Sequence, residues 1–126
     1  MSTYNRVNYS EVEPVSGVMH FLKEPLDSDR LGVTIAQCDP NWQSRPHDHS
    51  QNNHEEIYVL IEGKATVIVG DDPVPMEAGD AIRIPPEATR QIRNGEIQSI
   101  FVLISAAECK SRTDTEPEWN LDGVQG

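Results

Sequence analysis

The chain contains the stretch Pro46-His47-Asp48-His49-Ser50-Gln51-Asn52-Asn53-His54-Glu55-Glu56, which Ile57-Tyr58-Val59-Leu60-Ile61 and then Glu62-Gly63 follow directly. It holds three of the four histidines of the chain. The run that follows is apolar on both faces, which is typical of a β-strand covered on both sides. Imidazole nitrogens and carboxylate oxygens at the rim of a strand are the ligands of non-haem metal sites. The stretch therefore predicts a strand with a candidate metal site at its beginning.

Short strand-like runs with frequent turns extend over residues 31–105. Turn signals such as Gly70-Asp71-Asp72-Pro73 and Asn94-Gly95 separate the runs. The expected strands are Leu31–Cys38, Ile57–Ile61, Ala65–Val69, Val74–Met76, Ala81–Ile84, Arg90–Arg93 and Gln98–Ser105. No long segment keeps the 3.6-residue period of an amphipathic helix. We therefore predict an all-β antiparallel sandwich or barrel with little or no helix.

The two ends of the chain are less regular than the middle. Residues 1–30 are predicted to form an N-terminal extension, in which Val15 to Leu22 would add one strand at a sheet edge or pair with another subunit. Residues 31–105 form the predicted barrel. Residues 106–126 are polar and are predicted to be a C-terminal tail, which Trp119 and Leu121 would pin to the body.

Composition restricts the partners of the protein. The chain has 126 residues and a net charge of −11, from 21 acidic and 10 basic side chains. Nucleic-acid binding needs a basic face, so we expect none. The sequence has neither an apolar run long enough to span a membrane nor a signal peptide, so we expect a cytoplasmic protein. Cys38 and Cys109 are then most simply free thiols, although a disulfide between them stays open.

The histidine-rich stretch resembles the first motif of the cupin superfamily. That motif runs as Gly, five residues, His-x-His, a short spacer, Glu, six residues and Gly. His47 and His49 supply the histidine pair, and Glu56 lies at the motif's distance before Gly63. Asn41 stands at the first glycine position and also tolerates a left-handed backbone. The spacer before Glu56 has six residues, which is longer than usual in the family.

A second stretch resembles the second cupin motif, which runs as Gly, five residues, Pro, x, Gly, two residues, His, three residues and Asn. Gly79, Pro85 and Asn94 match it, and Glu87 stands at its inner glycine position. Arg90 stands where metal-binding cupins have their third histidine ligand. Together the motifs cover residues 31–105 and imply a double-stranded β-helix, the jelly-roll barrel of this superfamily. The resemblance also implies a homodimer, with residues 1–22 as the candidate exchanged segment.

Without the third histidine, the resemblance implies a metal set of His47, His49 and Glu56. Two imidazoles and one carboxylate suit a divalent Fe, Mn, Ni or Zn ion and leave coordination positions open. His54 and Glu55 are expected to lie outside the set. Residues 56, 58 and 60 share one face of their strand, so we expect Tyr58 to face the same interior and name it a candidate ligand contact.

Arg90 allows three outcomes, because a guanidinium carries a permanent charge and has no lone pair to offer a metal. In the first, a metal binds and Arg90 lies beside it, where it binds an anionic substrate group. In the second, no metal binds, and Arg90 pairs with Glu56 or holds an anionic ligand. In the third, Arg90 points outward and His54 supplies a further metal ligand.

Three functions are considered, and the first two correspond to the first two outcomes. The first is a small cupin that binds a divalent metal and a small anionic molecule, as a metal-dependent oxygenase or isomerase if it is an enzyme. The second is a metal-free, non-enzymatic module that binds a small molecule. The third is a metal-independent epimerase or isomerase with a histidine as base. The third needs a carboxylate partner for that histidine, and we expect the adjacent Asp48 to face away from it.

Overall fold

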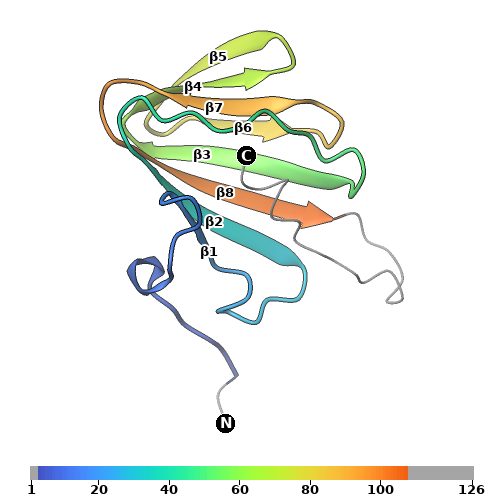
Figure 1. The fold of residues 1–126 in the computed structure, drawn as a ribbon. Helices are drawn as coiled ribbons and strands as arrows, with labels where there is room; N and C mark the ends of the chain where they lie inside the picture. Colours follow the sequence, from blue (N-terminus) through green and yellow to red (C-terminus); the bar gives the residue numbers. More distant parts are fainter. Residues whose placement is uncertain (1–2, 108–126) are drawn as a thin grey trace.

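The computed structural model describes residues 3–107, and its regular secondary structure is almost entirely β-strand (Figure 1). One short 3-10 helix, η1 (Tyr9–Glu11), precedes the strands. The strands are β1 (Met19–Phe21), β2 (Leu31–Cys38), β3 (His54–Glu62), β4 (Lys64–Val69), β5 (Asp72–Glu77), β6 (Ala81–Ile84), β7 (Arg90–Asn94) and β8 (Ser99–Ala107). The predicted all-β fold is confirmed, and each predicted strand of residues 31–105 is present.

The strands form two sheets, and every pairing within them is antiparallel. The larger sheet has the order β1-β2-β8-β3-β6, and the smaller has the order β5-β4-β7. Alternate residues of each strand point to the interior, as in β2, where Thr34, Ala36 and Cys38 are buried and their neighbours are less so. The buried core is Val18, Met19, Ala36, Cys38, Tyr58, Leu60, Ala65, Val67, Met76, Ile84, Ile92, Phe101 and Leu103.

Two motif positions depend on a left-handed backbone. Gly63 joins β3 to β4 with φ +90°, and a Cβ atom there would lie 2.5 Å from the carbonyl oxygen of Gln98. Only glycine fits so close an approach. Asn41, which replaces the first motif glycine, has φ 66°. This confirms that asparagine takes the left-handed conformation at that position.

Asn94, the last residue of the second motif, joins the end of β2 to the turn between β7 and β8. Its side-chain amide donates hydrogen bonds to the carbonyl oxygens of Cys38, Asp39 and Ile97, over 2.7–3.0 Å. Its amide oxygen accepts a hydrogen bond of 2.7 Å from the hydroxyl of Ser99. The role of this motif residue is therefore structural.

The N-terminal part forms one strand of its own, β1, shorter than the segment from Val15 to Leu22 that the sequence suggested. β1 pairs with β2 of the same chain, and exchange of residues 1–22 between subunits stays a prediction. Among residues 3–107, no helix is long and apolar enough to cross a membrane. Cys38 is a free, buried thiol, whereas the predictions for Cys109, Trp119 and Leu121 concern residues outside the described part.

Candidate metal centre

The His-x-His pair lies in an irregular segment before β3, not in a regular strand. His47 forms an isolated bridge to Arg90 of β7, and the amide of His49 donates to the carbonyl of Pro86 over 2.8 Å. The extended backbone ends there, because the carboxylate of Asp48 accepts hydrogen bonds from the amide and hydroxyl of Ser50 and closes a turn. Asp48 is exposed and points away from the histidines, as predicted.

The structure brings the three predicted metal ligands together. One ligand atom from each of His47, His49 and Glu56 lies within 4.8 Å of the others. The Nε2 atom of His49 is 3.4 Å from Oε2 of Glu56. The Nε2 atoms of both histidines are buried and have no hydrogen-bond partner among the described residues. A buried polar atom without a partner is costly, so these two nitrogens need an explanation.

The other ring nitrogens of the two histidines fix their tautomers. Nδ1 of His47 lies 3.3 Å from the carbonyl oxygen of Arg45, and Nδ1 of His49 lies 3.0 Å from the side-chain oxygen of Asn52. Because these oxygens only accept, each Nδ1 carries the hydrogen and each Nε2 presents a lone pair in the neutral ring. Burial lowers the pKa of His47 to about 4, so its ring is neutral at pH 7. This is the arrangement of metal-binding imidazoles.

The two carboxylate oxygens of Glu56 contact different neighbours. It points inward from β3 and is buried, with an exposed fraction of 3%. Oε1 accepts hydrogen bonds from Nη1 of Arg90 over 2.5 Å and from the hydroxyl of Tyr58 over 3.2 Å. Oε2 faces His49. Burial alone would raise the pKa of Glu56, but its neighbours His49 and Arg90 hold it below the usual value.

Arg90 points into the barrel and is fully buried, so the outcome in which it points outward is wrong. Besides Glu56, its guanidinium has backbone partners in the turn before β7. Nε and Nη2 donate to the carbonyl of Ala88 over 3.1 and 2.9 Å, and Nη2 donates to the carbonyl of Pro85 over 2.8 Å. Of the five N–H groups of a guanidinium, these bonds leave one on Nη1 for another acceptor.

Tyr58 lies behind Glu56 in the same interior layer. Its ring contacts Phe101 edge to face, with 6.2 Å between ring centroids. Burial raises the pKa of Tyr58 well above the usual value, so its hydroxyl stays protonated and donates to Glu56. The sequence named Tyr58 and Arg90 as ligand contacts, and both interact with a proposed metal ligand. Contact with a bound molecule stays a prediction for both.

The structure adds three polar residues that the sequence reasoning did not place in the site. Asn52 orients His49, and the ring of His54 stacks on that of His49, with 5.4 Å between centroids. Ser105 of β8 lies directly across from Glu56 in the sheet register. Its hydroxyl is buried and has no hydrogen-bond partner among residues 3–107. The available signal was the inward position of a serine in an otherwise apolar strand.

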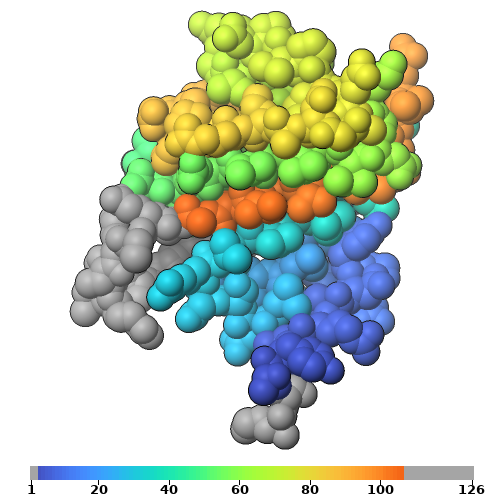
Figure 2. Space-filling model, turned by 180° about the vertical axis from the view of Figure 1, so that it is seen from behind, coloured from blue at the N-terminus to red at the C-terminus, as the bar shows by residue number. Residues whose placement is uncertain are grey.

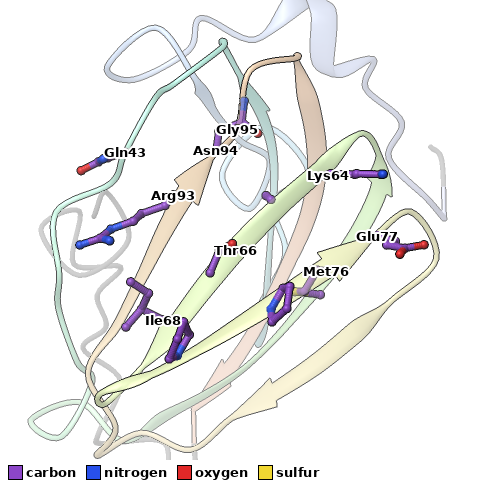
Figure 3. Close-up of a pocket in the computed structure, with 12 residues that line it drawn as sticks. Gln43, Lys64, Thr66, Ile68, Met76, Glu77, Arg93, Asn94 and Gly95 are labelled. Atoms are coloured by element: carbon purple, nitrogen blue, oxygen red, sulfur yellow. The ribbon is translucent and has the colours of Figure 1, made fainter.

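A separate groove of about 470 Å³ lies on the smaller sheet and contains none of these residues (Figure 3). Gln43, Thr66, Ile68 and Arg93 are among the residues that line it. Lys64 and Glu77 lie together at the end of the groove away from Gln43 (Figure 3). The groove is open and brings together no group of potential metal ligands.

The arrangement of strands and motif residues is that of a cupin. The sequence profile described as "Cupin domain" matches residues 34–104, which is more than half of the chain. The protein therefore belongs to the cupin family.

Individual relatives are distant. The chain is 23% identical over 115 residues to the uncharacterized protein MJ1618 of Methanocaldococcus jannaschii, which covers 88% of this chain and 92% of that protein. The crystal structure of the cupin protein BF4112 from Bacteroides fragilis is similar with a TM-score of 0.73 and 23% identity, over 94% of this chain and 100% of that one. A sugar phosphate isomerase of the cupin superfamily, SPO2919 from Silicibacter pomeroyi, has a TM-score of 0.60 and 17% identity, over 71% of this chain and 59% of that one. At these identities the structural likeness shows the fold alone.

Proposed function

We propose that this cupin binds one divalent transition metal ion through Nε2 of His47, Nε2 of His49 and Oε2 of Glu56. The observation that carries the proposal is the pair of buried Nε2 lone pairs that lack a partner and lie next to a carboxylate oxygen. Two imidazoles and one carboxylate suit Fe, Mn, Ni or Zn. The remaining positions would accept a small molecule with oxygen donors.

The metal would act as a Lewis acid or as an oxygen-activating centre, so the proposed reaction class is an isomerase or an oxygenase. Neighbouring residues of the chain orient the three ligand side chains for metal binding. Asn52 and the carbonyl of Arg45 keep both imidazoles in the ligating tautomer, and Arg90 and Tyr58 hold Glu56 in one orientation. The structural neighbours do not distinguish between the two reaction classes, because their likeness shows only the fold.

Metal analysis of protein purified without a histidine tag tests this proposal. We expect about one equivalent of metal after reloading, and loss of most of it in His49→Ala, because that change removes one of three ligands. His54→Ala is the matched control, since it removes a neighbouring imidazole that is not in the ligand set. Less than about a tenth of an equivalent of Fe, Mn, Ni or Zn in the reloaded wild-type protein would refute the proposal.

One observation favours the metal-free alternative, in which the barrel only binds a small molecule. The ion pair between Arg90 and Glu56 already neutralises the buried carboxylate without a metal. This alternative predicts that a small molecule raises the melting temperature while Mn(II), Fe(II), Ni(II) and Zn(II) do not. A metal-independent epimerase is less well supported, because no described carboxylate holds Nδ1 of either histidine.

A cytoplasmic location and a homodimer remain part of the proposal. Both follow from the sequence and the family resemblance. Gel filtration with light scattering would measure the oligomeric state directly.

A further inference from the structure

Arg90 changes the charge of the proposed metal site. Its guanidinium carries one positive charge and lies 2.5 Å from the carboxylate of Glu56, which carries one negative charge. The two histidines contribute neutral lone pairs. The protein groups around a bound divalent ion would therefore sum to zero charge, and the ion would keep both of its positive charges uncompensated.

Arg90 exerts this effect through its charge and not as a direct receptor for an anion. It is fully buried, and most of its donors are used by Glu56 and by the carbonyls of Pro85 and Ala88. It also restricts Glu56, because Oε1 accepts from both Arg90 and Tyr58 and only Oε2 is left for a metal. The protein would then supply three donor atoms, and more than one coordination position would be open.

We propose that the molecule bound at this metal is a small carboxylate that chelates through one carboxylate oxygen and an adjacent hydroxyl or carbonyl oxygen. A negative charge on the ligand compensates the charge that Arg90 leaves on the metal. The unpartnered hydroxyl of Ser105, across the sheet from Glu56, is placed to hydrogen-bond such an oxygen. Because most of the surrounding side chains are buried, the ligand must be compact. This inference rests on the proposed metal site.

Isothermal calorimetry with Ni(II)-loaded protein and two probes tests the inference. Glycolate and glycolamide have nearly the same size and the same chelating oxygens, and they differ by one negative charge. We expect glycolate to bind at least about tenfold more tightly than glycolamide. Arg90→Met should reduce this ratio to about threefold or less, whereas a purely structural role would weaken both probes equally.

Arg83→Met is the matched control. Arg83 also pairs with a glutamate of β3, Glu55, but on the exposed surface, so its loss should leave the ratio unchanged. Arg90→Lys keeps the charge and should keep the ratio. If Ni(II)-loaded wild-type protein does not prefer glycolate, or if Arg90→Met behaves like Arg83→Met, the inference is wrong while the metal site stands. If Ni(II) does not bind the wild-type protein, both are wrong.

A second inference rests on a different observation, the outer face of the larger sheet. Figure 2 shows β1, β2, β8, β3 and β6 side by side on this face, from bottom to top. Nine of its outward side chains on the three central strands are aliphatic: Leu31, Val33 and Ile35 of β2, Ile57, Val59 and Ile61 of β3, and Ile100, Val102 and Ile104 of β8. Leu31, Ile57 and Ile61 have exposed fractions of 54%, 39% and 52%. We call these nine residues the aliphatic face.

The aliphatic face continues across strands without a charge in its centre. The register aligns Val33 with Ile104 and Ile104 with Ile57, and the next row is equally apolar. Charged groups lie at its border: Arg83 of β6, paired with Glu55, is directly across from Ile57, and Glu62 is across from Ile100. Patches of this kind on the surface of a soluble chain indicate an interface.

We infer that the aliphatic face packs against the same face of a second copy. An apolar surface with no central charge is self-complementary, as a two-fold interface requires. Because it carries no negative charge in its centre, two chains that each have a net charge of −11 can meet there without direct repulsion between like charges. The three strands of the aliphatic face, about 4.8 Å apart, cover roughly 400 Å², and the shorter strands β1 and β6 extend the sheet to roughly 500 Å², against the roughly 800 Å² per partner of a standard interface. Two sheets packed face to face would bury this area.

Sedimentation equilibrium of the full chain tests this interface. We expect the wild-type protein to be a dimer and Ile57→Lys to be a monomer, because the change would place a further positive charge within the contact, beside Arg83. Ile97→Lys is the matched control, since Ile97 has an exposed fraction of 57% but lies in the turn before β8, so this variant should stay dimeric. A monomeric wild-type protein would overturn the inference. A dimeric Ile57→Lys variant would also overturn it and would favour exchange of residues 1–22.

Discussion

Replacing Glu56 with glutamine tests how the buried site is held together. The change keeps the shape of the side chain and removes its charge, so fully buried Arg90 loses its ionic partner. Breaking a buried ion pair in this way costs about 3–5 kcal/mol. Arg90 keeps its hydrogen bonds to the carbonyls of Pro85 and Ala88, which places the expected loss near the lower end, at about 3 kcal/mol. Domains of this size are stable by about 5–15 kcal/mol, so the variant should still fold.

Urea unfolding of metal-free protein, followed by circular dichroism, measures this loss of stability. The pH dependence of the loss shows whether it comes from the charge of Glu56. The pKa of Glu56 in the folded protein is held below its usual value of 4.5. The carboxylate therefore contributes stability above that value, and the contribution is lost as the pH falls through the lower folded pKa. The difference between wild-type protein and Glu56→Gln should be greatest at pH 7 and should shrink below about pH 4.

Glu55→Gln is the control that the chain itself provides. Glu55 also forms an ion pair with an arginine, Arg83, but their side chains are 50% and 59% exposed. An exposed pair contributes about 0–1 kcal/mol, so Glu55→Gln should have a small effect that salt removes. If Glu55→Gln and Glu56→Gln cost the same free energy, or if the cost of Glu56→Gln is independent of pH, the assignment of a buried ionic centre is refuted.

Three further predictions concern single residues. The pKa of His47 is lowered to about 4, so the folded protein takes up the His47 proton at lower pH than the unfolded chain does. Stability is therefore expected to fall as the pH drops from about 6.5 to about 4. In His47→Gln the urea midpoint of unfolding should depend less on pH over this range, and an unchanged pH dependence would contradict the assignment. Gly63→Ala should cost more than about 2 kcal/mol, because it adds a contact of 2.5 Å to an unfavourable φ of +90°. Gly70→Ala, with open space around a φ of +61°, should cost about 1 kcal/mol, and equal losses in thermal melts would contradict this. Tyr58→Phe removes the hydroxyl that donates to Glu56 and should cost about 1 kcal/mol in the same melts. No loss would show that this hydrogen bond does not stabilise the fold.

Much of the fold follows from local sequence, because strands and turns have local signatures. The period-two pattern of Leu31 to Cys38 and the Asn94-Gly95 turn place their elements correctly. The same reasoning assigns no element to residues 41–53, which form turns and isolated bridges. That segment is set by tertiary hydrogen bonds to β7 and to Pro86, and such bonds leave no periodic pattern in the sequence.

The candidate site, like the fold, could be predicted from the sequence only in part. The resemblance to the family motif groups His47, His49 and Glu56, and strand alternation explains why Glu56 faces inward. The direction of Arg90 is not a local property. It depends on the carbonyl oxygens of the turn before β7 and on a carboxylate that lies 34 positions earlier in the chain. The sequence did not predict Ser105 as a site residue, because a serine in a strand is informative only once its cross-strand neighbour is known.

The two adjacent glutamates of β3 show how the fold assigns different chemistry to identical side chains. Strand alternation points Glu55 outward to Arg83 and Glu56 inward to Arg90. The outer pair is solvated, and salt screens its charges over roughly 8–10 Å at ordinary ionic strength. The inner pair lies where little water screens it, so the charge of Arg90 acts on everything that binds to Oε2 of Glu56. An arginine in place of a histidine ligand therefore changes what the site attracts, because it removes one donor and adds one positive charge.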